Sequence, residues 1–207
     1  MIESIREAVL AGDRQKVVQE TEAALAAGRE PKEILDLALT PAMDVVGEEY
    51  ERGDRYVPEM LISAEAMKGA MATLKPLLAD AGVEPRGRIV IGTVEGDLHD
   101  IGKDLVTMML EGAGFEVTNL GVEVTADAFV QAVRDVSPHI VAMSALLTTT
   151  MTNMPSVIEA LSNEGLRDSV KVIIGGAPVT QEFADEIGAD GYAPDAASAV
   201  KLAVSLV

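Results

Sequence analysis

The hydrophobic periodicity of this chain changes near Arg86, and that change restricts the folds that the chain can adopt. Before Arg86, apolar residues recur at the three- and four-residue spacing of amphipathic helices, most clearly over residues 57–82. After it, short apolar runs alternate with amphipathic stretches that end at glycine. Strands that alternate with helices favour right-handed crossovers and a parallel sheet covered on both faces. The sequence therefore predicts a helical-bundle domain over residues 1–85 and an α/β domain over residues 86–207.

The first domain is predicted to contain four or five helices. Gly28 should end one helix, and Pro31 suits the first turn of the next. Thr40 is expected to cap a further helix that begins with Pro41. The longest helix should begin near Pro58. We therefore expect a small bundle ahead of the α/β domain.

The second domain is predicted to be Rossmann-like, with a flavodoxin-like sheet of five parallel strands. The expected strands are residues 87–94, 115–121, 139–146, 170–176 and 190–193. Ligands of such sheets bind beyond the carboxyl ends of the strands, where the strand order reverses. The loops that directly follow the strands are therefore the candidate site. A nicotinamide cofactor is disfavoured, because residues 92–97 read GTVEGD where the dinucleotide motif would place GxGxxG.

Composition excludes several classes of protein. The chain has no cysteine, so disulfides and thiolate metal sites are impossible. Its net charge of −18 at pH 7 disfavours nucleic acid and anionic membranes as partners, and it reflects either plain solvation or the steering of a basic partner protein. No apolar run reaches the roughly 18 residues of a membrane span, and charges interrupt the first turns where a signal peptide would be apolar. We therefore expect a cytoplasmic protein.

The loop after the first predicted strand contains the most informative residues. His99 lies in the segment GDLHDIG, between Asp97 and Asp100. A carboxylate two residues before an imidazole can accept the proton of one ring nitrogen, which leaves the other nitrogen available to a metal. One imidazole is a poor zinc site, but it suffices for a metal that arrives inside a macrocycle. The other histidine, His139, begins the third predicted strand, so we expect it at the opposite end of the sheet with a structural role.

Three further loops should meet the histidine loop at the same edge of the sheet. They are residues 144–152, 175–180 and 193–197. Gly175 and Gly176 are consistent either with a turn that needs positive φ or with a side-chain-free slot for an extended ligand. The threonines at 148–150 fit strand propensity as well as a hydroxyl-lined pocket. The residues alone leave both pairs of alternatives open.

Three elements together resemble the fingerprint of cobalamin-binding domains. The segment GDLHDIGKDLV matches its Asp-x-His-x-x-Gly element, residues 144–146 match Ser-x-Leu, and residues 175–176 match Gly-Gly. The elements occur in the family's order, and each follows a predicted strand. The resemblance is greatest to methionine synthase and to the corrinoid proteins of methanogen and acetogen methyltransferase systems for methylamines, methanol and related donors. Residues 1–85 are similar to the helical methyl-cap domain of that family.

The resemblance implies a bound cobalamin or related corrinoid with His99 as the lower axial ligand of cobalt. Asp97 would hydrogen-bond to His99, and Thr150 would extend the relay at the position where methionine synthase has serine. Asp104 stands where asparagine is more frequent, and we expect it to affect the helix surface. The implied cofactor-binding residues are Gly96, Asp97, Leu98, His99, Asp100, Ile101, Gly102, Ser144, Leu146, Thr148, Gly175, Gly176, Tyr192, Asp195 and Ala196.

The resemblance also implies that part of the helical domain shields the upper face of the corrin. The apolar residues at helical spacing there are Tyr56, Met60, Leu61, Met67 and Met71. We expect most of them to form the core of the bundle. One or two residues between Tyr56 and Ile62 would shield the methyl–cobalt bond.

The function implied by the resemblance is that of a methyl carrier in one-carbon metabolism. The chain would accept a methyl group on cobalt from a substrate-specific methyltransferase, and its cofactor would alternate between methylcob(III)alamin and cob(I)alamin. It would donate the group through a second methyltransferase to a thiol or tetrahydropterin acceptor, and a reductive activase would rescue oxidised cofactor. It would be a subunit of an enzyme system, since the chain is too short to add a substrate barrel of about 250 residues.

Three other functions stand as alternatives. A cobalamin-dependent sensor or regulatory domain would need a DNA-binding module, which the charge of −18 disfavours. The B12-binding subunit of a mutase would lack the helical domain. The last alternative is a doubly wound domain that binds no cofactor.

Overall fold

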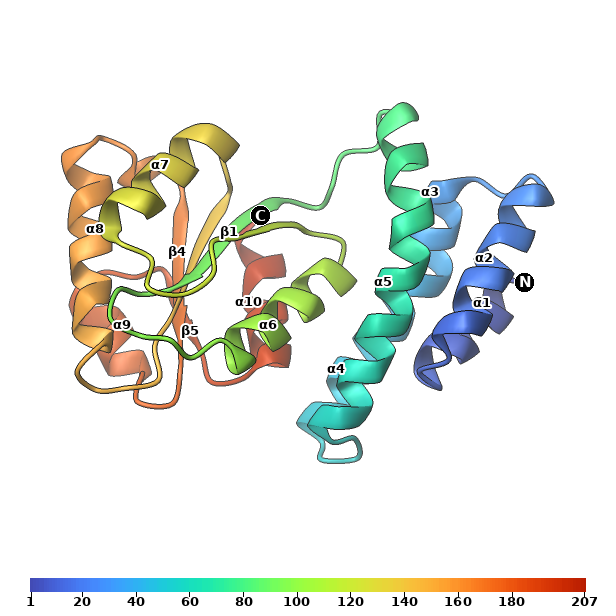
Figure 1. The fold of residues 1–207 in the computed structure, drawn as a ribbon, viewed down its shortest axis with the longest axis horizontal. Helices are drawn as coiled ribbons and strands as arrows, with labels where there is room; N and C mark the ends of the chain where they lie inside the picture. Colours follow the sequence, from blue (N-terminus) through green and yellow to red (C-terminus); the bar gives the residue numbers. More distant parts are fainter. The chain divides into compact units, whose positions relative to one another are not determined.

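The computed structural model describes residues 1–207 and forms two compact units. One unit comprises Met1–Pro85 with Glu111–Gly114, and the other comprises Arg86–Leu110 with Phe115–Val207. The first is helical and the second is built around a sheet (Figure 1). No helix in the chain combines the length and the apolar character needed to cross a membrane.

The helical unit is a bundle in which a long last helix packs against the earlier ones. Its elements are α1 (Ile2–Leu10), α2 (Arg14–Ala26), α3 (Pro31–Ile34), the π-helical turn η1 (Leu35–Leu39), α4 (Thr40–Glu51) and α5 (Val57–Asp80). The predicted start of the longest helix near Pro58 is confirmed, because α5 begins one residue earlier. Pro31 occupies the first position of α3, as predicted.

The predicted cap at Thr40 is wrong. Leu39 and Thr40 both have right-handed helical backbone, so α3, η1 and α4 form one continuous helix. Pro41 lacks the N–H that would bond to the carbonyl four residues earlier, and its ring crowds that carbonyl. The π-helical turn directly before Pro41 relieves this conflict by widening the helix, so the proline does not end it.

Arg55 joins three helices at the turn between α4 and α5. Its Nε donates to Glu49 Oε2 over 2.8 Å, and its Nη1 donates to the carbonyl of Leu10 over 3.1 Å and to Ser63 Oγ over 3.0 Å. These contacts fix the end of α1 and the start of α5 against α4. The next residue after Arg55 is Tyr56, which is exposed and lies immediately before α5.

The apolar residues of α5 divide between core and surface, largely as predicted. Met60 and Met67 are fully buried, which confirms them as core. Leu61 and Met71 are half-buried. The exposed large apolar residues are Ile62 and Leu77 of α5 and Tyr56, which directly precedes it.

The second unit has the predicted flavodoxin-like topology. Its strands are β1 (Arg88–Thr93), β2 (Glu116–Asn119), β3 (Ile140–Ser144), β4 (Lys171–Gly175) and β5 (Gly191–Ala193). They are all parallel, in the order β2-β1-β3-β4-β5. Its helices are α6 (Ile101–Gly112), α7 (Ala126–Val136), α8 (Met154–Asn163), α9 (Gln181–Ile187) and α10 (Ala196–Leu206). Both faces of the sheet are covered by helices, with α7 and α8 on one face and α6 and α10 on the other (Figure 1).

The core of this unit is aliphatic and holds the strands in register. Alternate strand residues such as Val90, Val141 and Val172 pack with Phe129 of α7 and Met154 of α8. The strand order reverses between β1 and β3, so the loops that follow these two strands begin side by side. The predicted candidate loops therefore meet at the switch point of the sheet.

His139 lies at the other end of the sheet, as predicted. It directly precedes β3, and its Nδ1 accepts a 3.0 Å hydrogen bond from the backbone N–H of Arg88. The backbone N–H of His139 in turn donates to the carbonyl of Arg88 over 2.8 Å. Its role is structural, because it joins the start of β1 to the start of β3.

Candidate functional site

The loop between β1 and α6 places the carboxylate of Asp97 at the switch point of the sheet. Gly96 has φ +79°, so the chain turns back there and the N–H of Asp97 donates to the carbonyl of Val94 over 3.2 Å. The carbonyl of Asp97 accepts from the N–H of Glu123 in the β2–α7 loop over 3.1 Å. The side chain of Asp97 is consequently buried, although its neighbours on both sides are exposed.

The buried carboxylate of Asp97 accepts four hydrogen bonds. Its Oδ1 accepts from Nδ1 of His99 over 2.7 Å and from the backbone N–H of His99 over 3.1 Å. Its Oδ2 accepts from the backbone N–H of Leu146 over 2.8 Å and from Oγ1 of Thr150 over 2.6 Å. The carboxylate thus connects the loop after β1 with the loop after β3.

These donors determine the charge of the site. Burial by itself raises the pKa of Asp97, but the hydrogen bonds from Thr150, from the N–H of Leu146 and from His99 outweigh it, so the pKa lies well below the usual range of aspartate. Asp97 is therefore ionised at neutral pH and can only accept hydrogen bonds.

The imidazole of His99 is held in one tautomer. Because Asp97 can only accept, Nδ1 must carry the proton, and Nε2 keeps its lone pair. The backbone is fixed as well, since the buried hydroxyl of Thr93 donates to the carbonyl of His99 over 2.9 Å. The His99 side chain is 51% exposed, and Nε2 has no hydrogen-bond partner in the protein. The site therefore presents one oriented nitrogen ligand at the surface.

Thr150 reaches Asp97 because the chain after β3 folds into a tight turn. The N–H groups of Thr150 and Met151 both donate to the carbonyl of Leu147, over 3.1 and 3.0 Å. Asn153 was missed by the sequence reasoning: its side-chain amide donates to the carbonyl of Glu95 over 2.8 Å and ties this turn to the histidine loop. No motif identifies Asn153, because the two residues are 58 positions apart and only the strand order brings them together.

The glycine pair ends β4 beside the same turn. Gly176 has φ +133°, and a Cβ there would lie 1.8 Å from the carbonyl oxygen of Ala145. A Cβ on Gly175 would lie 3.0 Å from the carbonyl oxygen of Ala193. Glycine is therefore required at 176 by the backbone of Ala145, directly after β3, and Gly175 lies tightly against β5. The positive φ expected of a turn is present at Gly176.

The remaining predicted residues fall into two groups. Those in the first group are exposed around the histidine or at the end of β3; they are Leu98, Asp100, Ile101, Gly102, Leu146 and Thr148. Ser144 is half-buried and lies in register with Thr93 and Gly175. The second group lies at the end of β5, where Tyr192 packs against the core, Asp195 caps α10 through a 2.8 Å bond from Ser198 N–H, and Ala196 is buried.

Comparisons with known proteins identify the family. A family model described as a B12 binding domain matches residues 87–201, and a second model with the same description matches residues 1–75. This chain belongs to the B12-binding corrinoid proteins. It is 44% identical to trimethylamine corrinoid protein 1 of Methanosarcina acetivorans, over 97% of this chain and 94% of that protein. It is 47% identical to the dimethylamine corrinoid protein of Methanosarcina barkeri, over 86% of this chain and 84% of that protein.

The fold of this corrinoid protein is also found in a solved structure. The methanol:cobalamin methyltransferase complex MtaBC from Methanosarcina barkeri contains a chain that matches it with a TM-score of 0.87 and 33% identity. The match covers 99% of this chain and 78% of that chain. Both units of the protein are therefore included in the likeness.

The residues at the switch point fit a corrinoid. No group of three or more His, Cys, Asp or Glu side chains could hold a metal ion, so a metal bound through His99 must bring its other ligands with it. Two large apolar side chains close to His99 in the sequence are exposed, Leu98 at 66% and Ile101 at 83%. Such a surface suits a flat macrocycle better than a hydrated ion.

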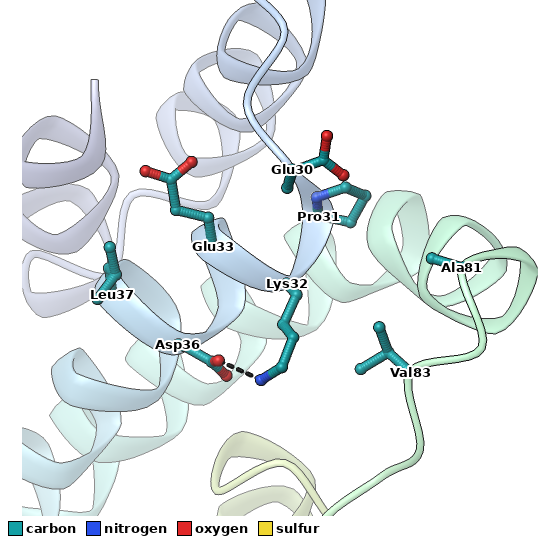
Figure 2. Close-up of a pocket in the computed structure, with 8 residues that line it drawn as sticks. All are labelled: Glu30, Pro31, Lys32, Glu33, Asp36, Leu37, Ala81 and Val83. Carbon is teal, nitrogen blue, oxygen red and sulfur yellow. Dashed lines mark hydrogen bonds and ion pairs between the residues drawn. The ribbon is translucent and has the colours of Figure 1, made fainter.

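A separate pocket of about 560 Å³ lies within the helical unit. It is lined by Glu30, Pro31, Lys32, Glu33, Asp36, Leu37, Ala81 and Val83. Figure 2 shows Lys32 and Asp36 paired at its edge. Both partners of this pair are exposed, and such pairs contribute little stability or specificity. None of the predicted site residues lines the pocket.

Asp97→Asn is expected to lower the free energy of unfolding of the α/β unit by about 3 kcal/mol at pH 7, because an amide cannot accept from all four donors. The pKa of Asp97 is lowered by folding, so its contribution is complete above the usual aspartate pKa and is lost as pH falls below about 4. The difference between wild type and variant should therefore shrink between pH 5 and pH 2. Urea unfolding at pH 7 and pH 3 measures it, and a pH-independent difference would contradict the role given to the carboxylate.

Proposed function

We propose that this corrinoid protein carries a methyl group between a substrate-specific methyltransferase and a second methyltransferase. One observation supports the proposal above all: a single imidazole, fixed in one tautomer by a buried carboxylate, presents an unpartnered nitrogen at an exposed edge of the sheet. A ligand exposed in this way suits a cofactor that other proteins must reach. The family and the relatives named above support the same proposal.

The site residues would divide the work as follows. When bound, the corrinoid supplies the cobalt that accepts a methyl group and passes it on. His99 Nε2 would hold the cobalt, and Asp97 would keep the proton of the imidazole on Nδ1. Thr150 and the N–H of Leu146 would hold the carboxylate in place and so fix the orientation of the ring.

The nucleotide tail of the corrinoid would lie along the loops after β3 and β4. We propose Ser144, Leu146, Thr148 and the glycine pair as its lining, with Tyr192, Asp195 and Ala196 at the far end. The exposed backbone and hydroxyl groups of the first set support this. The glycine pair would contribute its bare backbone beside Ala145, since no side chain fits there. For the helical unit we propose the shielding of a cobalt-bound methyl group, with the exposed Tyr56 and Ile62 as candidates.

Methylated amines are the proposed source of the methyl group. The relatives named for trimethylamine and dimethylamine align over most of this chain and most of their own length. The second partner would transfer the group to a thiol or tetrahydropterin, and a reductive activase would restore oxidised cofactor. The net charge of −18 supports docking of these partners through basic surfaces.

The proposal is tested by reconstitution with hydroxocobalamin, reduction, and addition of trimethylamine or dimethylamine with the methyltransferase of a Methanosarcina relative. We expect one corrinoid per chain and the absorbance of the methylated cofactor only when amine and methyltransferase are both present. Binding of corrinoid without methylation from amines or methanol would overturn the carrier proposal. Light-dependent binding to DNA would instead support a sensor.

A further inference from the structure

A lysine is buried in the first turn of α6, immediately after the histidine loop. The side chain of Lys103 is only 1% exposed, and lysine is rarely buried unless its charge is paired. Its Nζ forms an ion pair with Asp104 Oδ1 and donates to Asn119 Oδ1 over 2.9 Å. The amide of Asn119 donates to the same oxygen of Asp104 over 3.0 Å. Each of these three side chains therefore interacts with the other two.

This set attaches α6 to the turn that follows β2. Asn119 is the last residue of β2, and its Oδ1 also accepts from the N–H of Gly121 over 2.9 Å. The carbonyl of Gly121 accepts from the N–H of Thr93 at the end of β1 over 3.0 Å. The turn over residues 119–123 is thus fixed to the sheet, and Lys103 fixes α6 to the turn.

The same turn also holds the other end of the histidine loop. The N–H of Glu123 donates to the carbonyl of Asp97 over 3.1 Å. The segment with His99 is therefore attached to one turn at both of its ends, at Asp97 and at Lys103. Only residues 98–102 lie between the two attachments. Loss of either attachment should give these five residues more freedom.

We propose that Lys103, Asn119 and Asp104 act as a clamp that positions the histidine loop and sets how readily His99 binds and leaves cobalt. The three are positioning residues, because their hydrogen bonds join the helix after the loop to the turn beside it and so act on His99 through the backbone. The part of the proposal that concerns cobalt rests on His99 being the axial ligand. The part that concerns the loop does not, and the test separates the two.

The test compares Lys103→Met and Asn119→Ala with Lys171→Met. The first two remove the clamp, and the third removes a lysine that pairs with Asp190 at the start of β4. In the corrinoid-free protein, we expect amide hydrogen exchange of His99 and Asp104, whose N–H groups donate to Asp97 Oδ1 and to the carbonyl of Asp100, to become about tenfold faster in Lys103→Met and Asn119→Ala only. Exchange of the β3 amides should stay slow, which shows that the unit remains folded. The effects of the two changes should combine to less than their product in the double variant, because both changes break the hydrogen bond between Lys103 and Asn119.

The second readout is the absorbance spectrum after reconstitution with hydroxocobalamin, followed over pH. We expect the fraction with His99 on cobalt to fall about tenfold relative to the fraction without it, with no change in Lys171→Met. Unchanged exchange of the His99 and Asp104 amides in a folded Asn119→Ala variant would overturn the clamp, whatever the spectra show. Faster exchange combined with identical spectra for the wild type and His99→Ala would refute the axial ligand and leave the clamp of the loop intact.

Discussion

His99→Ala is expected to abolish the absorbance spectrum of histidine-ligated cobalt after reconstitution with hydroxocobalamin. Nε2 of His99 is the single oriented nitrogen that the site offers, and no group of three or more His, Cys, Asp or Glu side chains could hold a metal ion in its place. The bound fraction of corrinoid should fall at least tenfold, because the tail contacts alone must then hold the cofactor. Gel filtration and the absorbance of the protein peak measure both effects.

Folding should survive this substitution. The side chain of His99 is half-exposed, and in its absence Asp97 keeps three of its four donors, including the N–H of residue 99. His139→Ala is the matched control, since it removes the other imidazole from the opposite end of the sheet. It should cost about 1 kcal/mol of stability and leave the spectrum unchanged. If added imidazole restores the spectrum of His99→Ala, the missing ligand is identified directly; a histidine-ligated spectrum without any addition would exclude His99.

The pair of Asp97 and His99 could be predicted because its chemistry is local. A carboxylate two residues from an imidazole is visible in the sequence, and so is the switch from helical to alternating periodicity that places the pair after a strand. The five parallel strands followed from the same alternation. Such local patterns can be predicted because they depend only on the spacing of residues that are close together in the sequence.

Contacts that depend on strand register could not be predicted in the same way. Lys103 and Asn119 are 16 residues apart, and Asn153 and Glu95 are 58 apart. They meet only because β2 and β3 flank β1, and nothing in the sequence of either partner indicates the other. The π-helical turn before Pro41 was missed for a related reason. A proline normally marks the start of a helix, whereas here packing in the bundle keeps the helix continuous.

Gly176 was predicted from the sequence as a site residue, and the structure gives a further physical reason for glycine at this position. The sequence left a positive-φ turn and a side-chain-free ligand slot as alternatives. The structure adds a contact that alone requires glycine, since the Cα of Gly176 lies directly against the backbone of Ala145. The loops after β3 and β4 are consequently in contact, and the shape of one depends on the other.

Gly176→Ala is therefore expected to destabilise the α/β unit by more than about 4 kcal/mol. The new Cβ would lie 1.8 Å from the carbonyl oxygen of Ala145 and 2.9 Å from its carbonyl carbon, and backbone atoms directly after a central strand cannot move aside as a flexible side chain can. The backbone conformation adds strain, because φ +133° is rarely adopted by residues with a side chain. Hydrogen exchange of the β3 and β4 amides reports the free energy of unfolding of this unit separately from the helical unit.

Gly188→Ala separates the two contributions. Gly188 ends α9 with φ +73°, and a Cβ there would meet no atom within 4 Å, so this substitution introduces backbone strain alone and should cost about 1 kcal/mol. The difference between the two variants measures the steric contact with Ala145 together with the additional strain of φ +133° over φ +73°. If Gly176→Ala were no less stable than Gly188→Ala, the close approach of β3 and β4 at this edge would be refuted. The φ of +133° would then be the remaining demand of the fold for glycine at position 176.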